Sequence, residues 1–272
     1  MAERSQDEAT ESSPSEVEIV IGDEEAAPIK YNKRGMRVWG LSYIDILAKP
    51  DPVQAYDADE RKGVPLVIDI GAYTIKAGWA DKPEPSLVFR SRVARARKGF
   101  GETVGMMVGN DISNRESLRA QYRNYMEAGV VTNFITQEEI FDHIFSRLGI
   151  NTPSIDHPVV LTERVCAPIF TRARFFEMLY MAYGVPRIGL GVGCLVSNYL
   201  QTTTRPSANG SDDKYAIVIQ IGHSATHIVP LINGRMDSQN CKRVNIGAAS
   251  TAHYLHNLLR LKYPQHAGRI HV

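Results

Sequence analysis

The sequence has little of what marks several common classes of protein. Its 272 residues include 3 cysteines, Cys166, Cys194 and Cys241. They are far apart, odd in number and without metal-ligand spacing, which predicts reduced, buried thiols. No apolar run approaches the roughly 18 residues that a membrane span needs, and the first residues lack the basic flank and apolar core of a secretory signal. We therefore expect a cytosolic or nuclear protein with no membrane contact.

Excess charge of one sign is also missing. The formal net charge is +1, from 31 Lys and Arg against 30 Asp and Glu, so any attraction to nucleic acid has to be local. One local candidate is the run RSRVARARK, which begins at Arg90, ends at Lys98 and holds five basic residues. It could contact DNA or nucleosome phosphates, but an exposed loop or edge strand is the commoner explanation of such runs.

The first residues are acidic and have almost no aromatics. Residues 1–28 contain nine acidic side chains against the single Arg4, a composition that predicts disorder. Residues 36–47, MRVWGLSYIDIL, are apolar enough to dock on a partner as a peptide anchor, although packing on the same chain explains them equally well. We expect a tail over residues 1–62 and folded structure from residue 63.

The rest of the chain is organised around residues 66–90, LVIDIGAYTIKAGWADKPEPSLVFR. An apolar strand over 66–69 is broken at Gly71, and the return strand alternates apolar and polar residues up to Trp79. A third strand over 86–89 follows a proline turn. This pattern predicts a three-stranded antiparallel meander.

The first turn of this meander can hold a phosphate group. Backbone N–H groups around Gly71 and Ala72 can point at an anion, Gly71 allows close approach, and Lys76 supplies a positive charge. Asp69 at the strand end could hold a hydrated magnesium ion. An ordinary hairpin with a surface lysine explains the same residues, so this turn alone is a weak signal.

The remaining elements follow from periodicity and from glycine and proline breaks. We expect helices over residues 116–126, 136–148, 171–183, 192–200 and 247–262, and strands over 158–161, 187–190, 215–221 and 226–231. Thr136 with Glu139 forms a capping box. The strand at 158–161 is wholly apolar, which favours a central, parallel position. The last helix is predicted to turn four apolar residues inward: Ala252, Leu255, Leu258 and Leu259.

The hairpin at residues 215–231 repeats the first one in outline, with Gly222 at its turn. Two such hairpins, separated by strand, helix, strand and helix, predict a cleft with a phosphate-binding turn on each side. Four segments carry a specific resemblance: LVIDIGAYTIKAGWAD, GVVTNF, HPVVLTE and IGHSATHIVPLINGR resemble successive motifs of actin, in the same order and at similar spacing.

Resemblance to the actin family implies an α/β fold, the actin-like ATPase fold, in which flanking helices cover a ribonuclease-H-like mixed sheet. Residues 63–214 would form the first lobe, and residues 215–272 the start of the second lobe, most of which is not in this sequence. The inward leucine face of the last helix would then lose its packing and expose apolar area. ATP or ADP would be held through its phosphates, with magnesium bound to Asp69 through water. The implied binding residues are Asp69, Gly71, Ala72, Tyr73 and Lys76 in the first turn and Gly222, His223, Ser224 and Ala225 in the second.

The sequence departs from actin at the positions that hydrolyse ATP. The aspartate that helps to organise the metal and the attacking water is Gln220 here, and a second aspartate position is His223. The glutamine that orients this water aligns with Gly193. His227 is kept, but a buried histidine bonded to a carbonyl explains it better than catalysis. Each lost group lowers a rate by about 100- to 1000-fold, so we expect no catalytic residues and no enzyme activity. Because Lys76 and the Gly71 turn are kept while most of the second lobe is missing, we expect at most weak nucleotide binding.

Three further segments, at residues 155–158, 183–186 and 258–266, resemble a nuclear, actin-related branch of the family whose members are subunits of ATP-dependent chromatin remodellers. This implies a non-catalytic nuclear protein that acts in chromatin remodelling, transcription regulation and DNA repair, with remodeller subunits, including the motor ATPase, as partners. Two alternatives remain: a weak ATPase of the actin, hexokinase and chaperone superfamily, or a cytoskeletal subunit. Filament formation is disfavoured by a shorter loop between residues 97 and 108.

Overall fold

The computed structural model describes residues 50–95, 105–112, 120–204 and 215–266, together with the backbone of residues 30–31 and 37–38. The chain divides into two compact units, residues 1–47 and 48–272. In the first unit, β1 (Lys30–Tyr31) pairs antiparallel with β2 (Arg37–Val38). The acidic residues 1–28 and most of the 36–47 docking segment lie outside the described residues, so the expected disorder and docking stay predictions.

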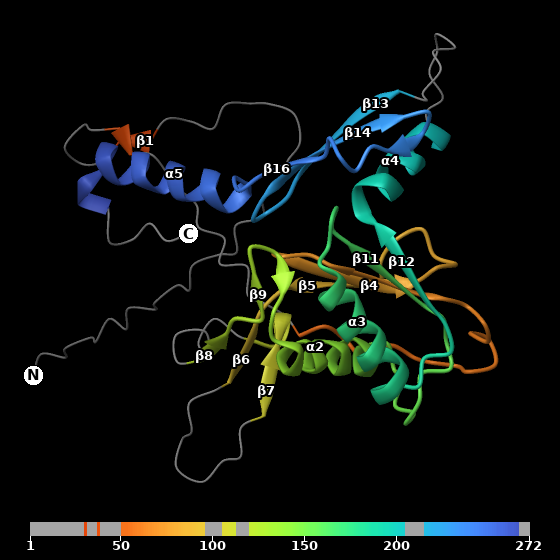
Figure 1. The fold of residues 1–272 in the computed structure, drawn as a ribbon. Helices are drawn as coiled ribbons and strands as arrows, with labels where there is room; N and C mark the ends of the chain where they lie inside the picture. Colours follow the sequence, from red (N-terminus) through yellow and green to blue (C-terminus); the bar gives the residue numbers. More distant parts are fainter. Residues whose placement is uncertain are drawn as a thin grey trace, which may run out of the picture. The chain divides into compact units, whose positions relative to one another are not determined.

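The larger unit is built on a five-stranded mixed sheet, in the order β12-β11-β3-β4-β5 (Figure 1). The predicted meander is present as β3 (Leu66–Ile70), β4 (Thr74–Trp79) and β5 (Leu87–Arg90), all antiparallel. β11 (Val159–Glu163) lies between β3 and β12 (Ile188–Val192) and is parallel to both. The central, parallel position expected for the apolar strand at 158–161 is thus confirmed.

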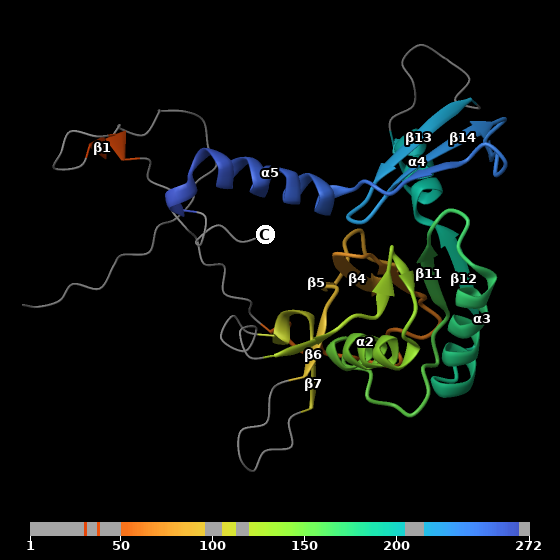
Figure 2. The same cartoon turned by 60° about the vertical axis from the view of Figure 1, so that its left-hand side comes forward.

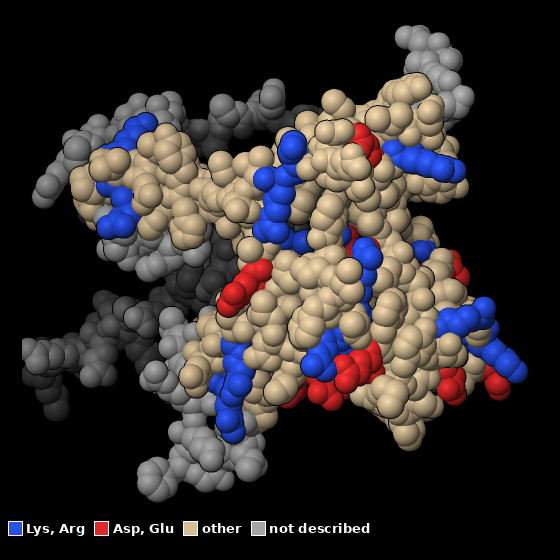
Figure 3. Space-filling view, in the orientation of Figure 1, with Lys and Arg blue, Asp and Glu red and all other residues tan. Residues whose placement is uncertain are grey.

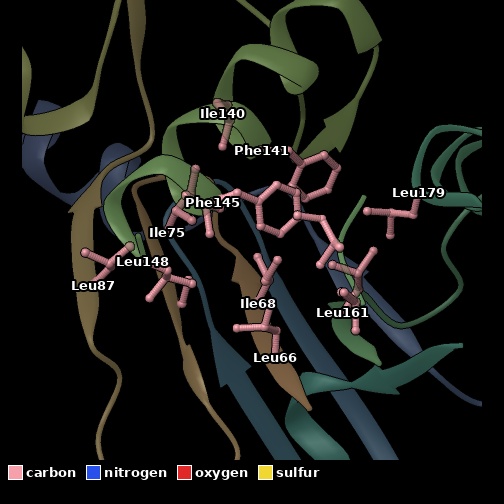
Figure 4. Packing of buried hydrophobic residues seen from close by; sticks show 14 of the residues in the cluster. Leu66, Ile68, Ile75, Leu87, Ile140, Phe141, Phe145, Leu148, Leu161 and Leu179 are labelled. Carbon is pink, nitrogen blue, oxygen red and sulfur yellow. The ribbon is translucent and has the colours of Figure 1, made fainter. Parts of the chain in front are cut away.

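Helix α2 (Phe134–Arg147) packs across one face of this main sheet, and Figure 4 shows its aromatic side chains above the strands. Phe141 and Phe145 belong to the same buried cluster as Ile68 on β3 and Ile75 on β4. The apolar residues of α2 recur at helical spacing, so a single face of the helix supplies them. Each large apolar side chain buried in this way contributes about 1.5–3 kcal/mol.

A second helix, α3 (Ile169–Glu177), continues as the π-helical segment η2 (Met178–Ala182), which adds the fully buried Leu179 to the core. The helix expected at 171–183 is therefore present, and it ends at Gly184 with φ +63°, the left-handed conformation that glycine adopts most easily.

No helix among the described residues is long and apolar enough to span a membrane.

Two local predictions in this region are wrong. The N-cap of α2 is Asn133, whose side chain accepts a hydrogen bond from the Thr136 backbone N–H at 3.1 Å, so Thr136 is a buried first-turn residue. The described part of the helix expected at 116–126 is extended instead: β8 (Gln121–Arg123) precedes β9 (Met126–Glu127). Pairing of β8 with another strand decided its structure, because local preference is weak where no apolar stripe exists.

A small sheet, in the order β7-β6-β8, lies beside the main one. It contains β7 (Met106–Val108) and β6 (Val93–Arg95), and the short helix η1 (Gly109–Asp111) follows β7. Asp111 joins this region to α2, because both of its carboxylate oxygens accept from Arg147 at 2.7 Å.

Residues before the expected boundary at residue 63 are packed on the core. The Tyr56 ring stacks on Trp79 at 6.1 Å, and its hydroxyl hydrogen-bonds the buried His157 at 2.8 Å. The Gln54 N–H also donates to the Arg147 carbonyl at 2.9 Å. Ordered structure therefore extends N-terminal to the boundary that composition predicted.

The chain then passes through α4 (Gly193–Thr204) to a second sheet, which holds β13 (Ala216–Ile221), β14 (Thr226–Ile232), β15 (Arg235–Met236) and β16 (Lys242–Val244). Figure 2 shows the β13–β14 hairpin beside α4. A small core joins them through four buried residues: Val165, Cys194, Val229 and Leu231.

The last helix, α5 (Ala248–Lys262), and the turn η3 (Pro264–His266) follow this sheet. No residue of α5 is buried, and Leu255 and Leu258 of its apolar face are both exposed, as expected for a face that has lost its packing. The three cysteines are free, as expected, but only Cys194 is buried, whereas Cys166 lies exposed in the loop after β11.

Substituting Phe141 by alanine should lower the free energy of unfolding by about 3–5 kcal/mol, because it removes a fully buried ring and leaves a cavity. Ile135 on the same helix is 77% exposed, so Ile135→Ala should change it by less than about 0.5 kcal/mol. Urea denaturation of the full chain measures both. Similar losses for the two variants would contradict this core.

Candidate functional site

The β3–β4 turn and the β13–β14 turn face each other across a cavity of about 350 Å³. Tyr73 in the first turn and His223 in the second are in contact, with ring centroids 4.8 Å apart. The Arg90 guanidinium lies over the Tyr73 ring at 4.1 Å. The facing turns predicted from the duplicated hairpin are therefore present.

The structure brings most of the predicted phosphate-binding residues to this cavity. The exception is Ser224, which is half-buried outside the lining. A Cβ at Gly71 would overlap the Thr74 carbonyl oxygen, so the first turn needs glycine for steric reasons. A Cβ at Gly222 would lie 3.0 Å from the Ala225 carbonyl oxygen, so the second turn has little room for a side chain. The predicted residues that line the cavity are Asp69, Gly71, Ala72, Tyr73, Lys76, Gly222, His223 and Ala225.

Asp69 is already engaged within the protein. Its Oδ1 accepts a hydrogen bond from the Thr162 hydroxyl at 2.5 Å. Its Oδ2 lies 4.0 Å from the Lys76 ammonium, which faces it in register on β4. The pair is substantially exposed, so Lys76 keeps donors free for an anion.

Three polar side chains form a row across the second sheet. Gln220 on β13 is in register with His227 on β14, which is in register with Arg243 on β16. Residues paired in this way point to one face of a sheet. His227 is 6% exposed, and the buried Nε2 of its ring has no hydrogen-bond partner among the described residues. The sequence suggested that a carbonyl group bonds this histidine, but no such partner lies at its Nε2 among the described residues.

Two arginines that pattern reasoning missed converge on one carbonyl group beside this row. Arg164 and Arg243 both donate to the Ala128 carbonyl oxygen, at 2.9 and 2.5 Å. Ala128 and Gly129 connect β9 to β10 (Val130–Val131) and have φ +44° and +78°, as two-residue hairpin turns require. A Cβ at Gly129 would overlap the Arg164 guanidinium, which fills that space.

One sequence signal could have found part of this set. Thr162 and Arg164 lie at and just beyond the carboxyl end of the parallel strand β11, the edge where open α/β sheets bind ligands. Arg243 offers no such signal, because its position depends on the pairing of β16 with β14. Burial, and then the nearby charge of Arg243, lower the pKa of Arg164.

The donor set suits an anion better than the magnesium ion that the resemblance implied. Mg²⁺ needs oxygen ligands in near-octahedral geometry, but the opposite turn supplies the Gln220 amide and the His223 ring instead of carboxylates. Both oxygens of Glu163 are held by Arg172 at 2.6 Å. The described residues contain no group of three acidic, histidine or cysteine side chains that could hold a metal.

Gly193 marks the position of the missing water-orienting glutamine, at the start of α4 and on the cavity wall. A Cβ there would lie 3.7 Å from the Gln220 amide nitrogen. The two altered positions, far apart in the sequence, are therefore neighbours in the cleft.

Comparison with known proteins agrees with this geometry. The family described as Actin matches residues 61–267. The chain belongs to the actin family. The two sheets and their facing hairpin turns are accordingly the actin-like fold, with a mixed sheet and flanking helices.

Among curated actin-family relatives, the chain is similar to actin-related protein 5 of several eukaryotes. Identity is 38% over 234 residues with the Homo sapiens protein, 41% over 239 residues with that of Gallus gallus, and 35% over 222 residues with that of Drosophila melanogaster. These alignments cover 83%, 85% and 75% of this chain, but 38%, 38% and 34% of the relatives. The chain is thus an actin-related protein that spans less than two fifths of the length of these relatives.

The first phosphate turn should be intolerant of a side chain at Gly71. Gly71→Ala forces the new methyl group against the Thr74 carbonyl, and we expect a loss of about 1–3 kcal/mol in the free energy of unfolding. Gly105 has no atom within 4 Å of an added Cβ and no positive φ, so Gly105→Ala serves as the matched control. Urea denaturation measures the stability of both variants. Coinciding curves for Gly71→Ala and Gly105→Ala would contradict the steric requirement at Gly71.

Proposed function

We propose that this actin-related protein is a non-catalytic subunit of a nuclear, ATP-dependent chromatin-remodelling complex. It would act in chromatin remodelling, transcription regulation and DNA repair through contacts with other subunits, including the motor ATPase. The observation that carries the non-catalytic role is an actin-like cleft in which Gln220, His223 and Gly193 stand together at the hydrolytic positions. The complex itself is inferred from the resemblance of the sequence to the nuclear branch of the family.

Hydrolysis needs a group that accepts a proton from water and a second group that orients that water. The Gln220 amide cannot serve as the base. The His223 ring packs at a tilt against Tyr73, and burial, followed by the charge of Arg90, lowers its pKa; burial lowers the pKa of His227 as well. Either histidine could accept a proton, but the position beside Gln220 that would orient the water is Gly193, which has no side chain.

Purified full-length chain should therefore turn over ATP at the rate of a buffer blank, and Asp69→Ala should leave that rate unchanged. A steady-state phosphate-release assay measures this. Turnover clearly above the blank that disappears in Asp69→Ala would establish an ATPase instead.

Apolar surface supports a role in assembly. Ile217, Ile219 and Ile221 alternate along β13, and therefore share one face of the second sheet; they are 69%, 60% and 73% exposed. A contiguous apolar face of this kind marks a surface for contact with other protein. We propose that it contributes to contact with other remodeller subunits.

A DNA contact through the basic run at 90–98 has less support. Val93 and Ala94 are fully buried in β6, Arg90 covers the Tyr73 ring, and the Nε of Arg92 is buried. Arg95 is exposed, and residues 96–98 lie outside the described residues. Figure 3 shows basic and acidic side chains interspersed on the face in view. Any DNA contact is therefore proposed only at Arg95 and the residues that follow, with a log-affinity slope of about −0.9 in log salt for each phosphate neutralised.

Affinity purification of the tagged chain from nuclear extract should recover remodeller subunits, and Ile219→Asp should reduce that recovery by placing a charge on the apolar face. Ile135→Asp is the matched control, since Ile135 is also exposed but lies on α2. Failure of the wild-type chain to recover any remodeller subunit would rule out the proposed function. Equal recovery with Ile219→Asp would rule out the role of this face.

A further inference from the structure

Two arginines come together at the wall of the cleft, and one of them, Arg164, lines the cavity. Arg164 from the loop after β11 and Arg243 from β16 meet at one neutral carbonyl oxygen, that of Ala128. A carbonyl dipole satisfies donors but does not cancel two like charges, and the repulsion grows in a partly buried site. The lowered pKa of Arg164 reflects both its burial and the charge of Arg243.

A buried nitrogen without a partner points to the same place. His227 lines the cavity in register with Arg243, and its Nε2 is buried with no hydrogen-bond partner among the described residues. Buried polar atoms in native proteins nearly always have a partner, so an unmatched one in a cavity wall suggests a ligand. Burial, and then the charges of Arg164 and Arg243, lower the pKa of His227, and one nitrogen of a neutral imidazole can still donate to an anion.

The described acidic groups of the cleft are partly engaged within the protein, and they are too few to surround a divalent cation. Asp69 accepts a hydrogen bond from the Thr162 hydroxyl and faces Lys76. Glu163 accepts hydrogen bonds from the Nε and Nη2 atoms of Arg172, one on each carboxylate oxygen. Guanidinium groups, by contrast, match oxyanions well, because their N–H fork can donate two parallel bonds. The side chains of this cleft therefore suit an anion, whereas the resemblance implied a magnesium ion.

We propose that the cleft is a metal-independent oxyanion site, in which Arg164 and His227, which both line the cavity, bind a phosphate-type group and the Arg164 guanidinium supplies the positive charge that a divalent ion would otherwise supply. The anion is either inorganic phosphate or the terminal phosphate of a nucleotide, since the shared chemistry is a tetrahedral oxyanion. This inference goes beyond the proposed function and does not depend on assembly into a remodeller.

Calorimetric titration of the full chain with ATP, ADP and inorganic phosphate, each in magnesium and in EDTA, tests this directly. ATP should bind in EDTA at least as tightly as in magnesium, because the metal-free nucleotide carries more negative charge for the arginines. Arg164→Gln should weaken binding in EDTA by about 10- to 100-fold, as expected for the loss of a charge-assisted hydrogen bond. Arg164→Lys keeps the charge without the fork and should lose less.

Arg174→Gln is the matched control, because Arg174 lies nearby on α3 but is exposed and pairs with Glu177 at 2.6 Å; it should bind like the wild type. Circular dichroism checks that each variant is folded. If phosphate alone binds with the same dependence on Arg164, the site takes the free anion; if only nucleotides bind, it takes their terminal phosphate. Binding that requires magnesium, no binding of any of the three anions in EDTA, or an Arg164→Gln variant that binds like the wild type would each overturn the inference. None of these results bears on the recovery of remodeller subunits, so the two proposals fail separately.

Discussion

The close approach of two glycine turns is the constraint on which the cleft depends. Gly71 and Gly222 each lie where a Cβ would press on a backbone carbonyl oxygen. Gly247 plays the same part for α5: the Ala248 N–H donates to the Gly222 carbonyl at 2.9 Å, and a Cβ at Gly247 would lie 2.5 Å from that oxygen. Glycine therefore sets the backbone geometry at all three places where the second turn is formed and held.

Around this scaffold, the chain keeps the shape of an actin-like cleft but changes its charges. The first turn retains Asp69 and Lys76, whereas the second turn presents an amide and a ring from Gln220 and His223. Arg164 adds a cation between them. An actin-family fold can tolerate such changes, because the backbone of the two turns, rather than their side chains, maintains the facing geometry. Fold and chemistry are separable in this way in many protein families.

Burial is distributed unevenly over the two sheets. The main sheet shares a continuous core with α2 and η2, while the second sheet has a small core around Val229 and an opposite face with exposed isoleucines. The main sheet should therefore be the more stable part of the chain, and the second sheet should be the part that offers an apolar surface for contact. This division agrees with the proposed role in assembly, where a rigid body presents an apolar surface to other protein.

The sequence by itself determined the elements whose signals are local. The meander at 66–90, the hairpin at 215–231 and α2 were predictable because alternation, helical spacing and glycine breaks act over a few residues. The duplicated hairpin also predicted that the two glycine turns face each other across one cavity, as the structure has them. Where the local pattern was weak it misled, as at the residues of β8, which were predicted to be helical and are extended by pairing with β6.

Only the tertiary structure decided how the cleft is charged. Arg164 and Arg243 reach the Ala128 carbonyl from 36 and 115 residues away, and no local pattern encodes a contact over such distances. Strand register placed Gln220, His227 and Arg243 in one row, and within the described part of the chain His227 Nε2 has no hydrogen-bond partner there. The exposed face of α5 is likewise a tertiary outcome, because an apolar stripe predicts that a helix can pack but not what it packs against.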